Sequence, residues 1–155
     1  MLSSVIQLNW VGVKLVTPFM TSLIKRPCLT VRGSSTLTKV IEVLSQNNIG
    51  AVLVSDKSGT VDGIISERDI VRRLIISQSL DGLLASDIMT KEVVSVTTAA
   101  SSSDLMKLMT EKRLRHLPIV SNDRLIGIVS IGDVVKRLLD KYECEVEQMR
   151  SFINA

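Results

Sequence analysis

The sequence predicts an α+β fold made of two tandem β-α-β-β-α repeats. The first observation behind this prediction is a twelve-residue segment that occurs twice, as "GIISERDIVRRL" at 63–74 and as "GIVSIGDVVKRL" at 127–138, with seven identical positions. The second is a helical spacing of apolar residues upstream of each copy, and the third is a turn-rich stretch between two short apolar runs. An internal repeat indicates a fold more strongly than an isolated motif does.

Each repeat is predicted to begin with an extended segment, at 29–31 and at 93–96. A helix follows, and it is expected to begin near Thr36 in the first repeat and near Ser103 in the second, because Ser and Thr side chains cap helix N-termini. In the first repeat, apolar residues recur at i, i+3, i+4 and i+7, which predicts a helix buried on one side. These residues are Leu37, Val40, Ile41 and Leu44.

Two short strands and a second helix complete each repeat. The apolar runs "AVLV" at 51–54 and "HLPIV" at 116–120 predict the first strand of each pair. The turn residues "SDKSG" and "SND" that follow predict a hairpin. The returning strand is expected to continue directly into a helix at Glu67 or at Ile131.

A weaker similarity precedes the repeats, "VTPFM" before the first and "ASDIM" before the second. In this alignment the first segment is followed by four extra residues before its strand. The predicted organisation is a lead-in segment at 1–15, the first repeat at 16–78, the second at 79–139 and a C-terminal helical extension at 140–155.

Composition narrows the function classes. The net charge of +3 is scattered and aromatic residues make up only 3%, so a nucleic-acid-binding surface is poorly supported. Cys28 and Cys144 are far apart and the chain has one histidine, so no metal site is predicted. We expect reduced thiols in a cytoplasmic protein. The apolar stretch at 1–20 is interrupted by polar residues and lacks a basic start, which predicts neither a signal peptide nor a membrane anchor.

Both repeats carry Ser-x-x-Asp where a strand is predicted to become a helix, as Ser66 with Asp69 and Ser130 with Asp133. One interpretation is structural, because a Ser followed three residues later by a carboxylate caps a helix start. The other is functional, because a helix N-terminus offers N–H groups and a partial positive charge to a phosphate. Arg68 can add a phosphate contact in the first copy, so we expect two unequal sites.

These motifs resemble the CBS (cystathionine-β-synthase) domain family, whose members occur as tandem pairs. The resemblance spans roughly 16–139 and rests on the repeated Gly-Ile-Ile/Val-Ser-x-x-Asp and on "RHLPIV" at 115–120. It implies two repeats packed around a pseudo-twofold axis, with two clefts for adenosine-containing ligands such as AMP, ADP, ATP or S-adenosylmethionine. It further implies a regulatory module that needs no cofactor and has no catalytic activity, with AMP or ATP as the expected ligand.

The resemblance also implies individual roles. Asp69 and Asp133 would accept hydrogen bonds from ribose hydroxyls. Arg115 and His116 would reach the phosphates of the nucleotide whose ribose is held by the other repeat, although a lone histidine is often a packing residue. The base would lie against aliphatic and backbone groups of 29–31 and 49–51 and of their counterparts.

The predicted C-terminal helix carries apolar residues spaced 4, 3, 4, 3 and 4, a pattern typical of a coiled coil. This heptad seam consists of Val135, Leu139, Tyr142, Val146, Met149 and Ile153. It predicts a self-association or partner surface, with a homodimer as the expected assembly. The alternative is that the helix packs back on its own chain.

Two other function classes stay open. In a structural or interaction protein, the Ser-x-x-Asp units are only caps and the C-terminal helix is the working surface. A nucleic-acid binder would use the scattered basic residues, with a steep salt dependence. An enzyme is the least supported class, because the sequence has no phosphate-binding loop with Lys, no metal cluster and no plausible catalytic triad.

Overall fold

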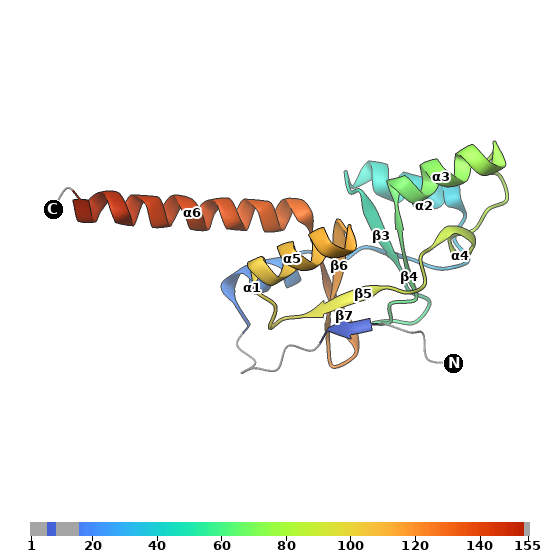
Figure 1. Ribbon diagram of the computed structural model, residues 1–155. Helices are drawn as coiled ribbons and strands as arrows, with labels where there is room; N and C mark the ends of the chain where they lie inside the picture. The colour runs from blue at the N-terminus through green and yellow to red at the C-terminus, as the bar shows by residue number, and fades with distance from the viewer. Residues whose placement is uncertain (1–5, 9–15, 154–155) are drawn as a thin grey trace.

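The first repeat forms a three-stranded mixed sheet with two helices, as predicted. The structure, a computed structural model, describes residues 6–8 and 16–153 (Figure 1). The elements of this repeat are β2 (Thr30–Val31), α2 (Leu37–Gln46), β3 (Ala51–Val54), β4 (Gly63–Ser66) and α3 (Glu67–Ser77). Strand β3 lies in the middle, parallel to β2 and antiparallel to β4.

The second repeat has the same order and the same pairing. Its elements are β5 (Val94–Thr97), α5 (Ser102–Lys112), β6 (His116–Ser121), β7 (Arg124–Ser130) and α6 (Ile131–Ile153). Strand β6 is parallel to β5 and antiparallel to β7. A short strand β1 (Ile6–Leu8) extends this sheet as a parallel neighbour of β5, so part of the predicted lead-in segment joins the fold. The rest of 1–15 lies outside the described residues.

The helix after the first strand begins with a side-chain cap in both repeats. The Thr36 hydroxyl accepts from the Lys39 N–H at 3.3 Å. In the second repeat the capping residue is Ser101 and not Ser103 itself, and the helix begins at Ser102, close to the predicted start. Ser101 accepts from the Asp104 N–H at 3.1 Å and donates to the Asp104 carboxylate at 2.6 Å. The reason is that this reciprocal pair needs a carboxylate three residues after the serine, and Ser103 has none there.

Each repeat is completed by a helix from the segment that precedes the other. Helix α1 (Pro18–Ile24) buries Met20 and Leu23 in the core of the second repeat. Helix α4 (Ala85–Ile88) lies instead in the core of the first repeat, through Ala85 and Ile88. A third apolar cluster joins the two sheets and contains Leu53, Val61, Val93 and Val120. The two repeats therefore share one interior.

The correspondence expected between "VTPFM" and "ASDIM" was wrong. A Cβ added to Gly63 would lie 2.5 Å from Met89 Sδ, and one added to Gly127 would lie 3.5 Å from Ile24 Cα. Met89 therefore corresponds to Ile24 and not to Met20. The pairing of Val31 with Val54 and of Val96 with Ile119 follows the same offset of 65 residues, so there are no four extra residues. Packing against the returning strand decides which residues of the two repeats correspond, whereas the short sequence similarity of the two segments is misleading.

Helix α6 packs on the body only near its start. Val134 is buried and Leu138 packs against the second-repeat core, whereas the remainder projects away from α2, α3 and α4 (Figure 1). The heptad seam residues measured in the structure are 40% to 83% exposed. Beyond Leu138 the helix does not pack back on the described part of its own chain. No described helix has the length and apolar character needed to cross a membrane.

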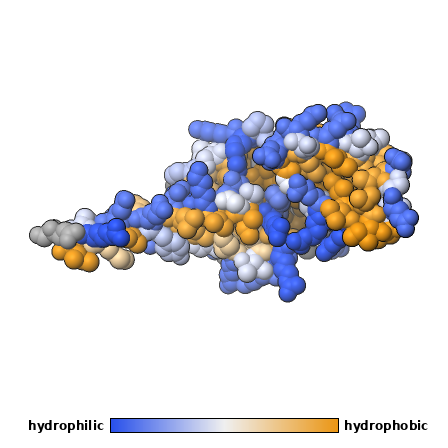
Figure 2. All heavy atoms as spheres, turned by 90° about the horizontal axis from the view of Figure 1, so that it is seen from above, coloured by the Kyte–Doolittle hydropathy of each residue, from blue (hydrophilic) through white to orange (hydrophobic). Residues whose placement is uncertain are grey.

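Apolar side chains also lie exposed on the body. Figure 2 shows hydrophobic residues both along α6 and over the opposite end of the molecule. Those on α3 are Val71, Leu74, Ile75 and Ile76. The molecular surface therefore has two exposed apolar regions, and such regions often mark interaction sites.

Candidate functional site

Two clefts open at the junction of the repeats, and the residues of the repeated motif line them. The Asp69 cleft, of about 280 Å³, brings Ser66, Arg68 and Asp69 of the first repeat together with Arg115 and His116 of the second. The Asp133 cleft, of about 630 Å³, is lined by Ser130, Asp133 and His116 of the second repeat and by residues of the first. Cavities for drug-sized ligands commonly measure about 300–1,000 Å³.

The apolar walls follow the predicted pattern only in part. Leu29, Ile49, Gly50 and Ala51 line the Asp133 cleft. Their counterparts at Val94 and at 114–116 line the Asp69 cleft. Thr30 and Val31 line neither cleft, and Val31 enters the core of the first repeat.

Both Ser-x-x-Asp units form the hydrogen bonds of a helix cap. The Ser66 N–H and hydroxyl donate to Asp69 Oδ2 at 2.8 and 2.6 Å. The Ser130 N–H and hydroxyl donate to Asp133 Oδ2 at 2.8 and 2.7 Å. The structural interpretation is therefore satisfied at both helices. These donors reach only Oδ2 of each carboxylate, so the Ser-x-x-Asp unit itself does not use the second oxygen, Oδ1.

The first backbone donor of each helix is already in use. The Glu67 N–H donates to the Gly50 carbonyl at 3.1 Å, and the Ile131 N–H donates to the Arg115 carbonyl at 2.8 Å. A phosphate at either helix start cannot receive that N–H group. Positive charge at the Asp69 cleft comes mainly from side chains, namely Arg68, Arg72, Arg113 and Arg115.

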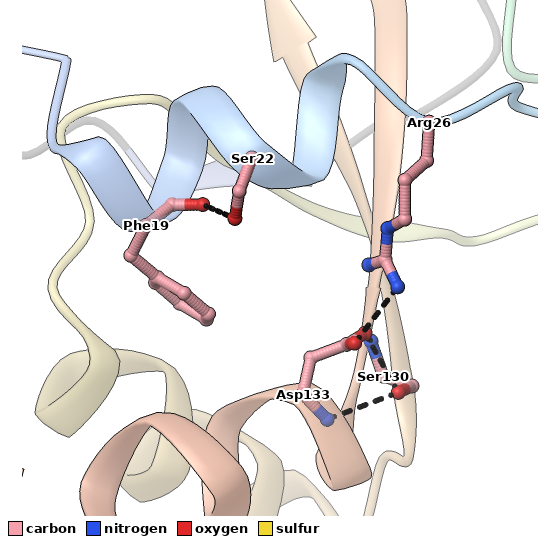
Figure 3. Close-up of polar contacts among 5 residues, drawn as sticks. All are labelled: Phe19, Ser22, Arg26, Ser130 and Asp133. Carbon is pink, nitrogen blue, oxygen red and sulfur yellow. Dashed lines mark hydrogen bonds and ion pairs between the residues drawn. The ribbon is translucent and has the colours of Figure 1, made fainter. Parts of the chain in front are cut away.

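Asp133 differs from Asp69 through an ion pair with Arg26. Figure 3 shows the Arg26 side chain reaching from the segment after α1 to Asp133, where Nη1 lies 2.9 Å from Oδ1. The Arg26 side chain is 51% exposed and that of Asp133 is 21% exposed. Burial raises the pKa of Asp133, but the hydrogen bonds from Arg26 and Ser130 outweigh it and hold the pKa below its ordinary value.

His116 lies between opposing charges. Burial is the largest influence and lowers its pKa, and Arg115 acts in the same direction. Asp133 and Glu67 oppose this change, but the pKa stays below its ordinary value. The imidazole is therefore largely neutral near neutral pH.

Sequence reasoning did not single out Arg26, Arg72 or Arg113. Arg113 ends α5 with a left-handed φ of 55°, and its counterpart Asn48, with a φ of 52°, follows the C-cap of α2 and lines the other cleft. Extending the 65-residue offset of the repeats to this point would have revealed Arg113. The same offset places Arg26 opposite Lys91, a pair of basic residues before the first strand of each repeat.

The described residues offer no metal or disulfide chemistry. They contain no group of three or more His, Cys, Asp or Glu side chains that could hold a metal ion. Cys28 and Cys144 are both free thiols, and burial raises the pKa of Cys28. A raised pKa makes a thiol a weaker nucleophile at neutral pH.

Comparison with known proteins identifies the repeats. Residues 20–76 and 85–140 each match the CBS domain family, and no catalytic domain is evident in these segments. CBSX3 of Arabidopsis thaliana, a CBS domain-containing protein named as mitochondrial, is 33% identical over 123 residues. The match covers 76% of this chain and 60% of that protein, so the chain spans less than two thirds of this relative's length.

Solved structures show the same architecture. The CBS-domain containing protein ATU1752 from Agrobacterium tumefaciens is 40% identical, with a TM-score of 0.68 over 72% of this chain and 90% of that one. The structure of CBSX2 in complex with AMP is 28% identical, with a TM-score of 0.64 over 74% of this chain and 89% of that one.

Proposed function

Because this chain belongs to the CBS domain family and carries two CBS domains in tandem, we propose that it is a regulatory module that binds adenine nucleotides in its two clefts. The observation that carries the proposal is the Asp69 cleft. There the Asp69 carboxylate, suited to a ribose diol, lies in a cleft that also holds guanidinium groups from both repeats, which suit phosphates, and the acidic side chains of Glu67 and Glu92. The AMP complex of the relative CBSX2 supports the same ligand class, with AMP or ATP as the proposed ligand.

Regulation would follow from the shared walls of the clefts. Each cleft takes residues from both repeats, so a nucleotide that prefers one arrangement of the repeats stabilises that arrangement. A partner protein that contacts one arrangement better then senses the nucleotide. In this proposal the chain binds and signals, and catalysis belongs to other proteins.

We also propose a homodimer formed through the heptad seam. A second copy presents an identical apolar stripe, and a two-fold contact covers both stripes at once. We further propose that the protein is located in the cytoplasm, a reducing compartment that agrees with its two free thiols.

Calorimetric titration with AMP tests nucleotide binding, using Asp69→Ala, Asp133→Ala and the matched control Asp104→Ala. All three variants lose a capping carboxylate, at a cost of about 1 kcal/mol in the free energy of unfolding. Asp104 lines neither cleft, so only the first two variants should weaken AMP binding, by about tenfold or more for the cleft concerned. Equal AMP binding by all four proteins would contradict the proposal.

The second candidate is an interaction protein without a ligand. It is favoured by the apolar residues exposed on α3 and α6 and by the Ser-Asp hydrogen bonds at the starts of α3 and α6. In that case Asp69→Ala and Asp133→Ala would lower stability and leave partner binding intact, and no nucleotide would release heat.

A further inference from the structure

The carboxylates of Asp69 and Asp133 differ in how many of their oxygens accept hydrogen bonds from the protein itself. At Asp133 the Ser130 donors take Oδ2 and the Arg26 guanidinium takes Oδ1, at 2.9 Å. At Asp69 the donors found in the described residues all come from Ser66 and all reach Oδ2. Lys91, which corresponds to Arg26 in the other repeat, forms no ion pair with Asp69. The pseudo-symmetry of the repeats is therefore broken at this carboxylate.

Arg26 is held in place by the local backbone. Its N–H donates to the Leu23 carbonyl at 3.2 Å as α1 ends, and Leu23 is buried in the second-repeat core. This turn aims the side chain along the edge of the Asp133 cleft (Figure 3). Lys136, Arg137 and Asp140 line the same pocket as this pair, so the basic side chains around Asp133 outnumber the acidic ones.

We propose that Arg26 occupies the ribose-binding position of the Asp133 cleft and thereby makes the Asp69 cleft the tighter nucleotide site. The inference rests on the proposed function, because it needs Asp133 to be a ribose acceptor. A ribose hydroxyl that donates to Asp133 Oδ1 must displace the Arg26 N–H. The ion pair is partly exposed, so the competition lowers affinity by a modest factor, about two- to fivefold.

The test measures binding at the Asp133 cleft alone, in an Asp69→Ala background. Adenosine and AMP are titrated by calorimetry into this protein and into its Arg26→Gln and Lys25→Gln derivatives. Lys25 is an exposed neighbour that makes no ion pair with any described residue, so its variant matches the change in charge. Adenosine has the ribose diol and no phosphate, so it reports the carboxylate without a phosphate contribution from any arginine.

We expect Arg26→Gln to tighten adenosine binding about two- to fivefold, with Lys25→Gln unchanged. Unchanged or weaker adenosine binding in Arg26→Gln would overturn the role of Arg26, as would the absence of any binding in both proteins while the wild type binds AMP. Weaker AMP binding with unchanged adenosine binding would identify Arg26 as a phosphate contact and also overturn it. The proposed function itself fails in a different way, when neither the wild type nor any variant binds AMP.

Discussion

At the scale of single residues, His116 is the ionisable side chain that the two clefts share among the described residues. Asp133 and Glu67 favour its charged form, whereas burial and Arg115 favour its neutral form. Burial prevails, because desolvation penalises the imidazolium more than the two carboxylates stabilise it. The interior of the molecule thus keeps this side chain neutral in the absence of a ligand.

This balance predicts a pH dependence of stability. The pKa of folded His116 lies below its ordinary value of 6.5, so between these two values the unfolded chain binds more protons. The free energy of unfolding should therefore fall as the pH is lowered through this window. Urea unfolding at a series of pH values should show a shallower fall for His116→Gln. Identical slopes for the two proteins would show that His116 contributes nothing.

At the scale of elements, the glycines of the repeated motif help to position helices α1 and α4. Gly63 on β4 and Gly127 on β7 stand at the same place in their repeats, yet their surroundings differ. An added Cβ at Gly63 would meet the Sδ, Cγ and Cβ atoms of Met89 at 2.5 to 3.0 Å. At Gly127 the nearest atoms lie at 3.5 Å, an ordinary contact.

The two sites form a matched pair for mutation. Gly63→Ala should lower the free energy of unfolding by about 1–3 kcal/mol, because Met89 and the segment after α4 have to move. Gly127→Ala meets no such overlap and should cost clearly less. Thermal and urea unfolding of both variants measure this difference, and equal losses would argue against the packing explanation.

At the scale of the whole molecule, two features stand out. Helices α1 and α4 each pack on the opposite repeat, and helix α6 projects from the body with an exposed apolar seam. Because α1 packs on the second repeat and α4 on the first, neither repeat has a complete core without the other. The heptad seam is exposed beyond the first turns of α6. A second copy is the occupant that we propose for it.

Charge introduced into the heptad seam should separate the dimer. Leu139→Glu with Met149→Glu places carboxylates at two exposed seam positions, so sedimentation velocity should shift from dimer to monomer. The control is Gln148→Glu, which adds a carboxylate on α6 outside the heptad seam. A wild type that sediments as a monomer at all concentrations would contradict the proposed assembly.

The sequence by itself determined the features that depend on near neighbours. The two β-α-β-β-α units, the hairpins and the caps at Ser66 and Ser130 all follow from spacings of a few residues. Repetition then identified the positions of Asp69 and Asp133 at equivalent helix starts. Such contacts form between residues that any helical or hairpin backbone brings together.

Only the tertiary structure decided the rest. Arg26 and Asp133 are 107 residues apart, and their contact exists because α1 crosses to the other repeat. The four extra residues inferred from "VTPFM" disappeared for the same reason, since packing against Gly127 sets the position of α1. The exposure of the heptad seam depends likewise on where the body ends. Spacing along the chain specifies local hydrogen bonds, whereas these long-range contacts depend on how the two repeats fill a common interior.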